Sequence, residues 1–421
     1  MDSQEGINVS VNSEIGKLQH VLIHMPGPEL EKVTPENAHT FLFSDILNMQ
    51  VAQKEYGYFK RVLQKVTQVH EVADLLTDIL HDENVKNNLV ERICKVEDKG
   101  FLATYLKALP AEDLSRQLIE GVRLEDVTFI NKDPYALLPI PNLFFMRDAS
   151  FTMFDNIMIS NMATTVRARE CIILNSIYNL HPLFDTKVIN PALNYDTHGE
   201  GTVEGGDVQI IRDDVVICGL GSRTNMHGVE ALVEHLKTKP GVKHLIFQEL
   251  PLEPESFIHL DMVFTFLNTH QCMMYEPMLR KTGNFADKST TLITIDNGNI
   301  RYEQKDNILQ ALKEVGMDLE PVFCGGDDAW TQQREQWHSG ANFFALDEGR
   351  IIGYERNSHT IDALDHAGFS VLAAEDVCSG KVDINDYAKC VVTFKAGELP
   401  RAGGGARCMT MPINRNEVTG K

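Results

Sequence analysis

The segment Val208-Gln-Ile-Ile-Arg-Asp-Asp-Val-Val-Ile-Cys218 carries the pattern that decides the fold. Two short apolar runs rich in Val and Ile flank the polar pair Asp213-Asp214. Apolar runs that enclose a polar turn predict a β-hairpin. The residues that follow, 226–236, have the apolar periodicity of a helix. This stretch therefore predicts two antiparallel strands followed by a helix.

The same pattern recurs along the chain. Hairpins are expected over 151–160 with a turn at Asp155-Asn156, over 262–274 with a turn near Asn268, and over 342–354 with a turn at Glu348-Gly349. Helical periodicity follows over 167–178 and 360–367. Two terminal segments, Val21–His24 and Cys408–Met411, predict strands that complete a fifth unit. Repeated units that each bury a face against their neighbours indicate a pseudo-symmetric α/β architecture.

One region does not follow the repeat. From about Asp74 to Glu125 the sequence is charged and helical in period, and three prolines near residue 139 then return the chain to the main body. We expect a helical insertion over 74–138, placed between the first part of the main domain at 1–73 and its remainder at 139–421.

Composition limits the classes of function. The chain has 421 residues and a formal net charge of −21, which disfavours nucleic acid and anionic membranes as partners. No long uncharged apolar run predicts a membrane helix, and the acidic start is unlike a secretory signal. The eight cysteines form no CxxC pair, which favours a reducing compartment, so we expect a cytoplasmic protein.

Polar motifs stand at equivalent places before the hairpins. Asp148 precedes the first, Glu204 the second, and His259 with Asp261 the third, whereas Cys408 follows a glycine run and Arg407. In a pseudo-symmetric ring, equivalent positions converge on one centre. Each motif also has a structural reading: an ion pair, a turn, a surface contact or a buried cysteine. Metal binding is disfavoured, because no HxH or HExxH spacing is present.

Together these residues specify a chemistry. A thiol, a histidine and several carboxylates suit attack on a planar cationic carbon. A guanidinium offers five N–H donors that carboxylates match in pairs. Its positive charge would also favour the thiolate form of a nearby cysteine. The expected partner is therefore a small guanidino compound.

At this point the chain resembles the bacterial-type arginine deiminases of the guanidino-group modifying superfamily. The resemblance is carried, nearly end to end, by Ser13–Leu18, His24–Gly27, Pro141–Asp148, Glu204–Asp207, His259–Asp261, Arg334–Trp337, Tyr354–Asn357 and Arg407–Pro412. It implies a five-bladed α/β propeller of ββαβ modules with a helical insertion. It also implies hydrolysis of L-arginine to L-citrulline and ammonia in the cytoplasm, no cofactor, no metal, and a homo-oligomer.

The resemblance implies a role for each site residue. Cys408 is the nucleophile, His259 the acid and then the base, and Glu204 its partner, while Asp148 and Asp261 hold the guanidino nitrogens. The resemblance and the missing charge discussed next give the expected substrate-binding residues Asn142, Phe145, Arg167, Arg223, Arg401 and Arg407.

Three departures from the family pattern bear on substrate choice. The chain has Phe145-Met146-Arg147-Asp148 where the family has Phe-Thr-Arg-Asp, and His24-Met25 where it has His-Arg. Gly403 stands where the family has a second arginine, and Arg401 or Arg407 would supply the missing charge. The alternatives are a citrulline, agmatine or modified-arginine hydrolase, an amidinotransferase, a non-catalytic binding propeller, or a zinc hydrolase. Agmatine lacks the carboxylate that Arg167 and Arg223 would bind.

Overall fold

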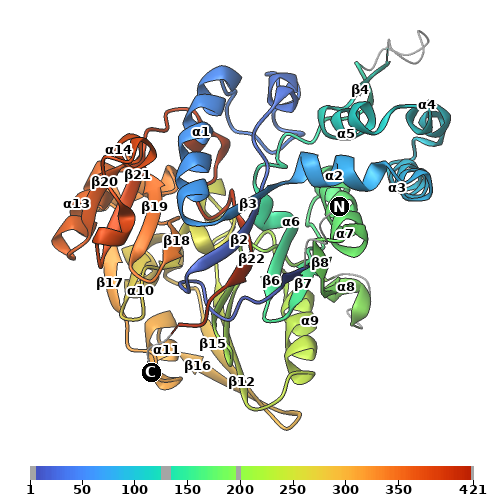
Figure 1. Cartoon of the computed structure of the whole chain (residues 1–421). Coiled ribbons are helices and arrows are strands. Elements are labelled where there is room, and N and C mark those ends of the chain that lie inside the picture. Colours follow the sequence, from blue (N-terminus) through green and yellow to red (C-terminus); the bar gives the residue numbers. More distant parts are fainter. Residues whose placement is uncertain (1–5, 125–133, 196–200, 419–421) are drawn as a thin grey trace.

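Five sheets of this mixed α/β protein share one strand order. The computed structural model describes residues 6–124, 134–195 and 201–418. Within them, each of these sheets has an antiparallel pair whose second strand also pairs in parallel with a third strand. Figure 1 shows the sheet that joins the two ends of the chain, where β22 (Met411–Arg415) lies beside β2 (Leu18–Ile23). The parallel step is covered by a helix, as parallel strands require a crossover. The expected order of strand, strand, helix and strand is therefore present.

The bounds of these units are close to those expected. The first two units comprise β6 (Ser150–Met153), β7 (Asn156–Ile159), α7 (Ala168–Leu180) and β9 (Lys187–Ile189), then β10 (Val208–Arg212), β11 (Val215–Leu220), α9 (Met226–Lys237) and β12 (Lys243–Glu249). The third comprises β13 (Phe264–Phe266), β14 (Gln271–Met274), α11 (Ile308–Glu314) and β17 (Glu320–Phe323).

The last two units differ from the others: the fourth contains an extra strand and an extra helix, and the fifth is built from both ends of the chain. The fourth comprises β18 (Phe344–Asp347), β19 (Arg350–Tyr354), α13 (Ser358–His366), β20 (Ser370–Ala373), α14 (Ala374–Ser379) and β21 (Cys390–Phe394). The fifth joins the two ends of the sequence in β22 (Met411–Arg415), β2 (Leu18–Ile23), α1 (Met49–Val66) and β3 (Gln68–Glu71).

Two local predictions need correction. Met153 pairs with Asn156, so the first turn is Phe154-Asp155 and lies one residue earlier than expected. The strand predicted over 408–411 begins only at Met411, and Cys408 lies in the preceding turn. Cys408 and Arg407 there are held by polar contacts with side chains of other segments, which replace the pairing of a strand.

A further hairpin was not predicted. Strands β15 (Thr290–Asp296) and β16 (Asn299–Lys305) extend the second sheet beyond β12. Their turn contains Asn297 and Gly298, which both have positive φ. An Asn-Gly pair between two strands is a strong hairpin signal, because both turn positions tolerate that conformation.

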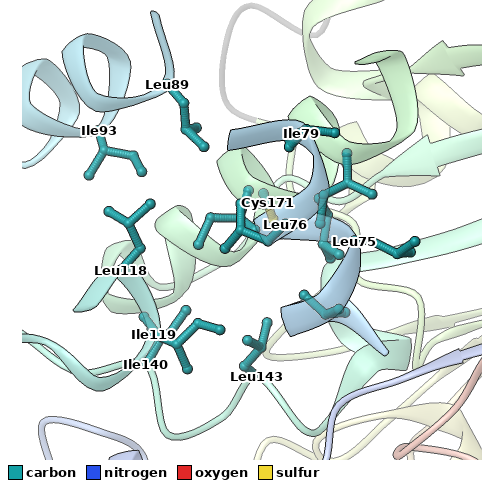
Figure 2. Packing of buried hydrophobic residues seen from close by; sticks show 14 of the residues in the cluster. Leu75, Leu76, Ile79, Leu89, Ile93, Leu118, Ile119, Ile140, Leu143 and Cys171 are labelled. Atoms are coloured by element: carbon teal, nitrogen blue, oxygen red, sulfur yellow. The ribbon is translucent and has the colours of Figure 1, made fainter. Parts of the chain in front are cut away.

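The helical region packs against α7 and does not stand apart. It comprises α2 (Val72–Leu80), α3 (Glu83–Val96), α4 (Ala103–Lys107) and α5 (Ala111–Glu120). In Figure 2, the side chains of Leu76, Ile93 and Leu118 lie in one cluster with Cys171 of α7. The helices therefore share a core with the first unit. Residues 125–133 lie outside the described part, and the division at 74 and 138 stays a prediction.

The remaining short elements connect these units. They are β1 (Ile7–Asn8), β4 (Val122–Arg123), β5 (Tyr135–Leu137), α6 (Met146–Ala149), β8 (Phe184–Asp185), α8 (Pro191–Asn194), α10 (Glu276–Arg280) and α12 (Ala329–Trp337). Within the described ranges, every helix is too short or too polar to cross a bilayer.

Candidate active site

Four segments far apart in the sequence bring the predicted catalytic side chains together. Asp148 lies in α6, Glu204 in the turn before β10, and His259 and Asp261 at the short 3-10 helix Leu260–Met262. Cys408 lies in the turn before β22. All five side chains are buried. Burial of this many ionisable groups requires that they compensate one another.

Short contacts connect the imidazole to two carboxylates and the thiol to a third. His259 Nε2 lies 3.0 Å from Glu204 Oε2, and His259 Nδ1 lies 3.6 Å from Asp148 Oδ1. Cys408 Sγ lies 3.7 Å from Asp261 Oδ2. The groups expected to converge therefore do so in this structure.

Gly206 explains why a glycine is needed beside the histidine. A Cβ atom built there would lie 2.5 Å from His259 Nδ1, closer than side-chain atoms approach one another. The neighbouring amide of Gly205 donates to the Asp148 carbonyl, and the amide of Asp261 donates to the Gly206 carbonyl. The Glu-Gly-Gly-Asp motif thus fixes Asp148, Glu204 and the His259 segment relative to one another.

The charges around His259 keep it protonated at neutral pH. Burial alone would lower the pKa of His259, but the carboxylates of Asp148, Glu204 and Asp207 outweigh it and raise that pKa to about 9. Burial likewise opposes ionisation of Glu204, yet its hydrogen bond to His259 lowers the Glu204 pKa. The pair is therefore an imidazolium carboxylate, a form in which the ring can donate a proton.

The same environment keeps Cys408 as a thiol. Burial and the carboxylates of Asp261 and Asp148 raise the pKa of Cys408 well above its usual range. A thiol is a poor nucleophile until it loses its proton. A cationic ligand placed between these carboxylates would lower that pKa again, so the site is matched to a substrate that brings positive charge.

Arg167, and not the adjacent Arg147, is the ion-pair partner of Asp148. Arg167 Nη1 donates to Asp148 Oδ2 at 2.6 Å, and its other nitrogens donate to Glu170. Asp148 Oδ1 accepts no hydrogen bond in the structure. Arg167 therefore orients the carboxylate and leaves one oxygen for another donor. Asn142 contributes its backbone carbonyl to Arg167 at 3.3 Å.

A cavity of about 360 Å³ borders the site at Met262, whose sulfur lies 4.0 Å from Cys408 Sγ. Arg223, Arg401 and Gly403 line it, together with Met262, which follows Asp261. Arg401 is paired with Asp45 and Glu398, whereas Arg223 Nη1 is buried with no hydrogen-bond partner. Two of the predicted substrate-binding arginines thus lie at the cavity, and Arg223 has a nitrogen free to bind an anion.

Comparison with known proteins identifies the family. A family model described as arginine deiminase matches residues 39–415. The chain belongs to the arginine deiminase family. The arginine deiminase of Listeria monocytogenes is 31% identical over 99% of this chain and 100% of its own length. That of Pediococcus pentosaceus is 30% identical, over 97% and 99%.

Solved structures share the fold at low sequence identity. The amidinotransferase SxtG from Microseira wollei superposes with a TM-score of 0.53, 13% identity and 99% coverage of both chains. A dimethylarginine dimethylaminohydrolase bound to S-methyl-L-thiocitrulline gives a TM-score of 0.51 at 12% identity, covering 94% of this chain and 99% of its own. Like this arginine deiminase family member, both are mixed α/β proteins.

Asn342 is a site residue that the sequence analysis missed. Its Nδ2 donates to Cys408 Sγ at 3.2 Å and to the Asp261 carbonyl at 3.0 Å. Its Oδ1 accepts from the amides of Arg407 at 2.8 Å and Cys408 at 3.3 Å. The structure begins the fourth hairpin at Phe344, so Asn342 stands just before it, as Asp148, Glu204 and Asp261 stand before the first strands of their units.

Arg407 lies behind the site in this member of the arginine deiminase family. Its guanidinium donates to both oxygens of Glu14 at 3.0 Å, to Asp261 at 2.9 Å and to the Val208 carbonyl. Burial opposes ionisation of Glu14, but Arg407 and Arg147 lower the pKa of Glu14 to about 2. The structure thus supports a positioning role for Arg407, through Asp261.

Phe145 packs against the glycine run that precedes Cys408, residues 403–405. A Cβ atom at Gly404 would lie 2.4 Å from the Phe145 ring, and Tyr354 donates to the Gly404 carbonyl at 2.8 Å. The amide of Arg147 donates to the Cys408 carbonyl at 3.0 Å. These contacts fix the turn that carries Cys408.

In the described part of the chain, no group of three or more His, Cys, Asp or Glu side chains is arranged to hold a metal ion.

Proposed function

We propose that the protein hydrolyses L-arginine to L-citrulline and ammonia through a covalent intermediate on Cys408. One observation carries this proposal: a buried thiol and a protonated imidazole share a site with three carboxylates. A neutral substrate would not compensate these carboxylates, whereas a guanidinium would. Family membership supports the same reaction.

Substrate binding uses the unsatisfied carboxylate oxygens. The Asp148 Oδ1 atom, which accepts no hydrogen bond, would take one N–H of the substrate guanidinium. Asp261, whose Oδ2 also holds Arg407, would take another. With both nitrogens fixed, the central carbon faces the Cys408 sulfur, and this positioning lowers the entropic cost of attack.

The first half of the reaction forms the carbon–sulfur bond. The Cys408 proton passes to Asp261, whose own pKa is raised by burial despite the opposing charge of Arg407. The thiolate adds to the guanidinium carbon. The His259 imidazolium donates its proton to the departing nitrogen, the carbon–nitrogen bond breaks, and ammonia leaves. A cationic thiouronium on Cys408 and a neutral His259 remain.

The second half consumes water. Neutral His259 takes a proton from a water molecule as the hydroxide adds to the thiouronium carbon, which restores the imidazolium beside Glu204. The carbon–sulfur bond breaks with its electron pair returning to sulfur, which recovers its proton from Asp261. The hydroxyl proton of the product is released to solvent and balances the protonation of ammonia.

The distal end of the substrate would reach the cavity that borders the site. Arg223 Nη1, buried and without a hydrogen-bond partner, would bind the α-carboxylate. Phe145 would pack on the alkyl chain. Asn142, whose amide nitrogen now donates to the Phe41 carbonyl, would add a contact only after rotation. Arg401 would need to leave Asp45 to reach the substrate.

The test is product analysis with a matched cysteine control. Wild-type enzyme should release equal amounts of citrulline and ammonia from arginine, and mass spectrometry after rapid quenching should find the adduct on Cys408. Cys408→Ala should abolish turnover, whereas Cys378→Ala, a part-buried cysteine distant in sequence, should retain it. Near-native turnover by Cys408→Ala would refute the mechanism. Agmatine, citrulline and an amine acceptor in the same screen distinguish the alternative hydrolase and amidinotransferase activities.

We also propose that the five units close into a five-bladed propeller. The shared strand order and the pairing of β2 with β22 support this arrangement. Homo-oligomerisation and cytoplasmic location stay predictions. Light scattering of the purified protein would test the former, and fractionation of the source cells the latter.

A further inference from the structure

The cavity that borders the active site exceeds what free arginine needs. Its volume of about 360 Å³ falls in the range of about 300–1,000 Å³ typical of drug-sized ligands. None of the five catalytic side chains is among its lining residues, so the cavity lies outside the guanidinium site. The carboxylate, ammonium and Cα of arginine are only a handful of atoms. Space for an additional group therefore remains.

One part of the wall of this space is apolar. Leu42, Phe43, Leu252, Ile258 and Trp337 line it. Leu252 is 70% exposed and Trp337 is 45% exposed, so these apolar surfaces are accessible before ligand binds. Exposed apolar surface rimmed by polar groups marks a binding site. The walls suit an aliphatic or aromatic group on the ligand.

Two charged side chains limit how that ligand is oriented. Arg223 has a buried Nη1 atom with no hydrogen-bond partner, which suits a carboxylate. Glu255 adds an acidic group to the same lining, which suits an ammonium. The other arginine of the lining, Arg401, is already paired with Asp45 and Glu398.

Gly403 keeps the cavity open on the remaining side. Its φ of 88° lies in the left-handed region that favours glycine. A Cβ atom built there would meet no atom within 4 Å. A side chain would project into open space at the cavity lining, and glycine leaves that space to the ligand.

We propose that the site also accepts short peptides that end in arginine and carry an apolar residue before it. This inference rests on the proposed function, because the guanidine is cleaved by the same residues. The free carboxylate of the terminal arginine would bind Arg223. The preceding apolar side chain would pack between Trp337 and Leu252, and the terminal ammonium would lie toward Glu255.

The test compares four compounds on the full-length enzyme: arginine, Leu-Arg, Arg-Leu and N-acetyl-Leu-Arg. The measured quantity is kcat/KM for ureido product. Leu-Arg should equal or exceed arginine. Arg-Leu should be at least about tenfold poorer than Leu-Arg, because its carboxylate is displaced from Arg223. Acetylation should lower kcat/KM by a few fold, because the ammonium near Glu255 is lost.

Two tryptophans on helix α12 provide the matched variants. Trp337→Ala should lower the ratio of kcat/KM for Leu-Arg to that for arginine by about tenfold, the loss expected for part of an apolar contact. Trp330 is 78% exposed and lies outside the cavity lining, so Trp330→Ala should leave the ratio unchanged.

The outcomes separate this inference from the proposed function. Turnover of arginine together with kcat/KM for Leu-Arg more than about 100-fold lower would overturn the inference and leave the proposed function intact. Equal rates with Leu-Arg and Arg-Leu, or an unchanged ratio in Trp337→Ala, would also overturn it. No turnover of any of the four compounds would overturn both.

Discussion

Replacing Glu204 with glutamine tests the electrostatic account of the site. In the wild type, His259 Nε2 lies 3.0 Å from the Glu204 carboxylate. Glutamine has the same size and keeps a hydrogen-bonding group there, but it removes the negative charge. Since the pKa of His259 is raised to about 9 by nearby carboxylates, Glu204→Gln should lower it. His259 would then lose, at a lower pH, the proton that it donates in the first half-reaction.

The size of the effect follows from the number of carboxylates involved. The pKa of His259 is raised from 6.5 to about 9 by Asp148, Glu204 and Asp207 together, against burial. Glu204 makes the closest contact of the three, so its removal should lower the pKa by about one unit or more, equivalent to about 1.4 kcal/mol. The alkaline limb of kcat/KM for arginine should shift from near pH 9 to about pH 8 or below.

The assay is ammonia release between pH 6 and 10, with a remote buried carboxylate as control. Glu335 is buried and accepts hydrogen bonds from Thr360, away from His259. Glu335→Gln should therefore leave the alkaline limb of kcat/KM at the same pH, even if the substitution destabilises the fold. An unmoved or raised alkaline limb in Glu204→Gln would refute the reasoning.

The same group contributes to stability. A histidine whose folded pKa is raised stabilises the fold fully below its unfolded pKa of 6.5, and that contribution disappears as the pH rises through about 9. The rise of the His259 pKa from 6.5 to about 9 corresponds to about 3 kcal/mol. Urea unfolding should show a smaller decline over this pH range in Glu204→Gln than in the wild type.

Two further substitutions test residues that hold the nucleophile. Asn342→Ala should lower kcat/KM by about 10- to 100-fold. Its hydrogen bond to the Cys408 sulfur becomes a bond to a charged group once the thiolate forms, and such bonds contribute about 1.5–3 kcal/mol. Steady-state kinetics within twofold of wild type would contradict this. Glu14→Gln should reduce the free energy of unfolding by about 3–5 kcal/mol, because Arg407 stays buried with one carboxylate fewer. Urea denaturation measures it, and Asp318→Asn, in the pair with Lys313 that is exposed on both sides, should show little change.

Local sequence patterns predicted the hairpins because strand period and turn chemistry are short-range properties. The Asn297-Gly298 turn carries the same signal for β15 and β16, a hairpin that lies outside the repeated pattern of strand, strand, helix and strand. The acidic motifs were found because each stands before a hairpin. Asn342 holds the corresponding position before the fourth and was missed because the predicted hairpin began at Asn342, whereas β18 begins at Phe344.

The partners of buried arginines were harder to predict. Arg147 is adjacent to Asp148, yet Arg167 pairs with that carboxylate. Arg407 precedes the nucleophile, yet it binds Glu14 from the opposite end of the sequence. Ion pairs of this kind depend on tertiary packing, and neither periodicity nor spacing contains that information. Family resemblance placed these residues near the site but did not give the direction in which their side chains point.

The contact between Glu14 and Arg407 has a consequence for how the protein is made. The two residues are 393 positions apart, and the neighbouring strands β2 and β22 pair across a similar separation. A nascent chain can pair β2 with β3 early, but it must leave the other edge of β2 unpaired until its last segment is synthesised, and such non-local pairing slows folding. The reactive thiol is carried by that last segment. A growing chain thus acquires its nucleophile and the partner strand that encloses it in the same step, so incomplete chains contain no competent active site.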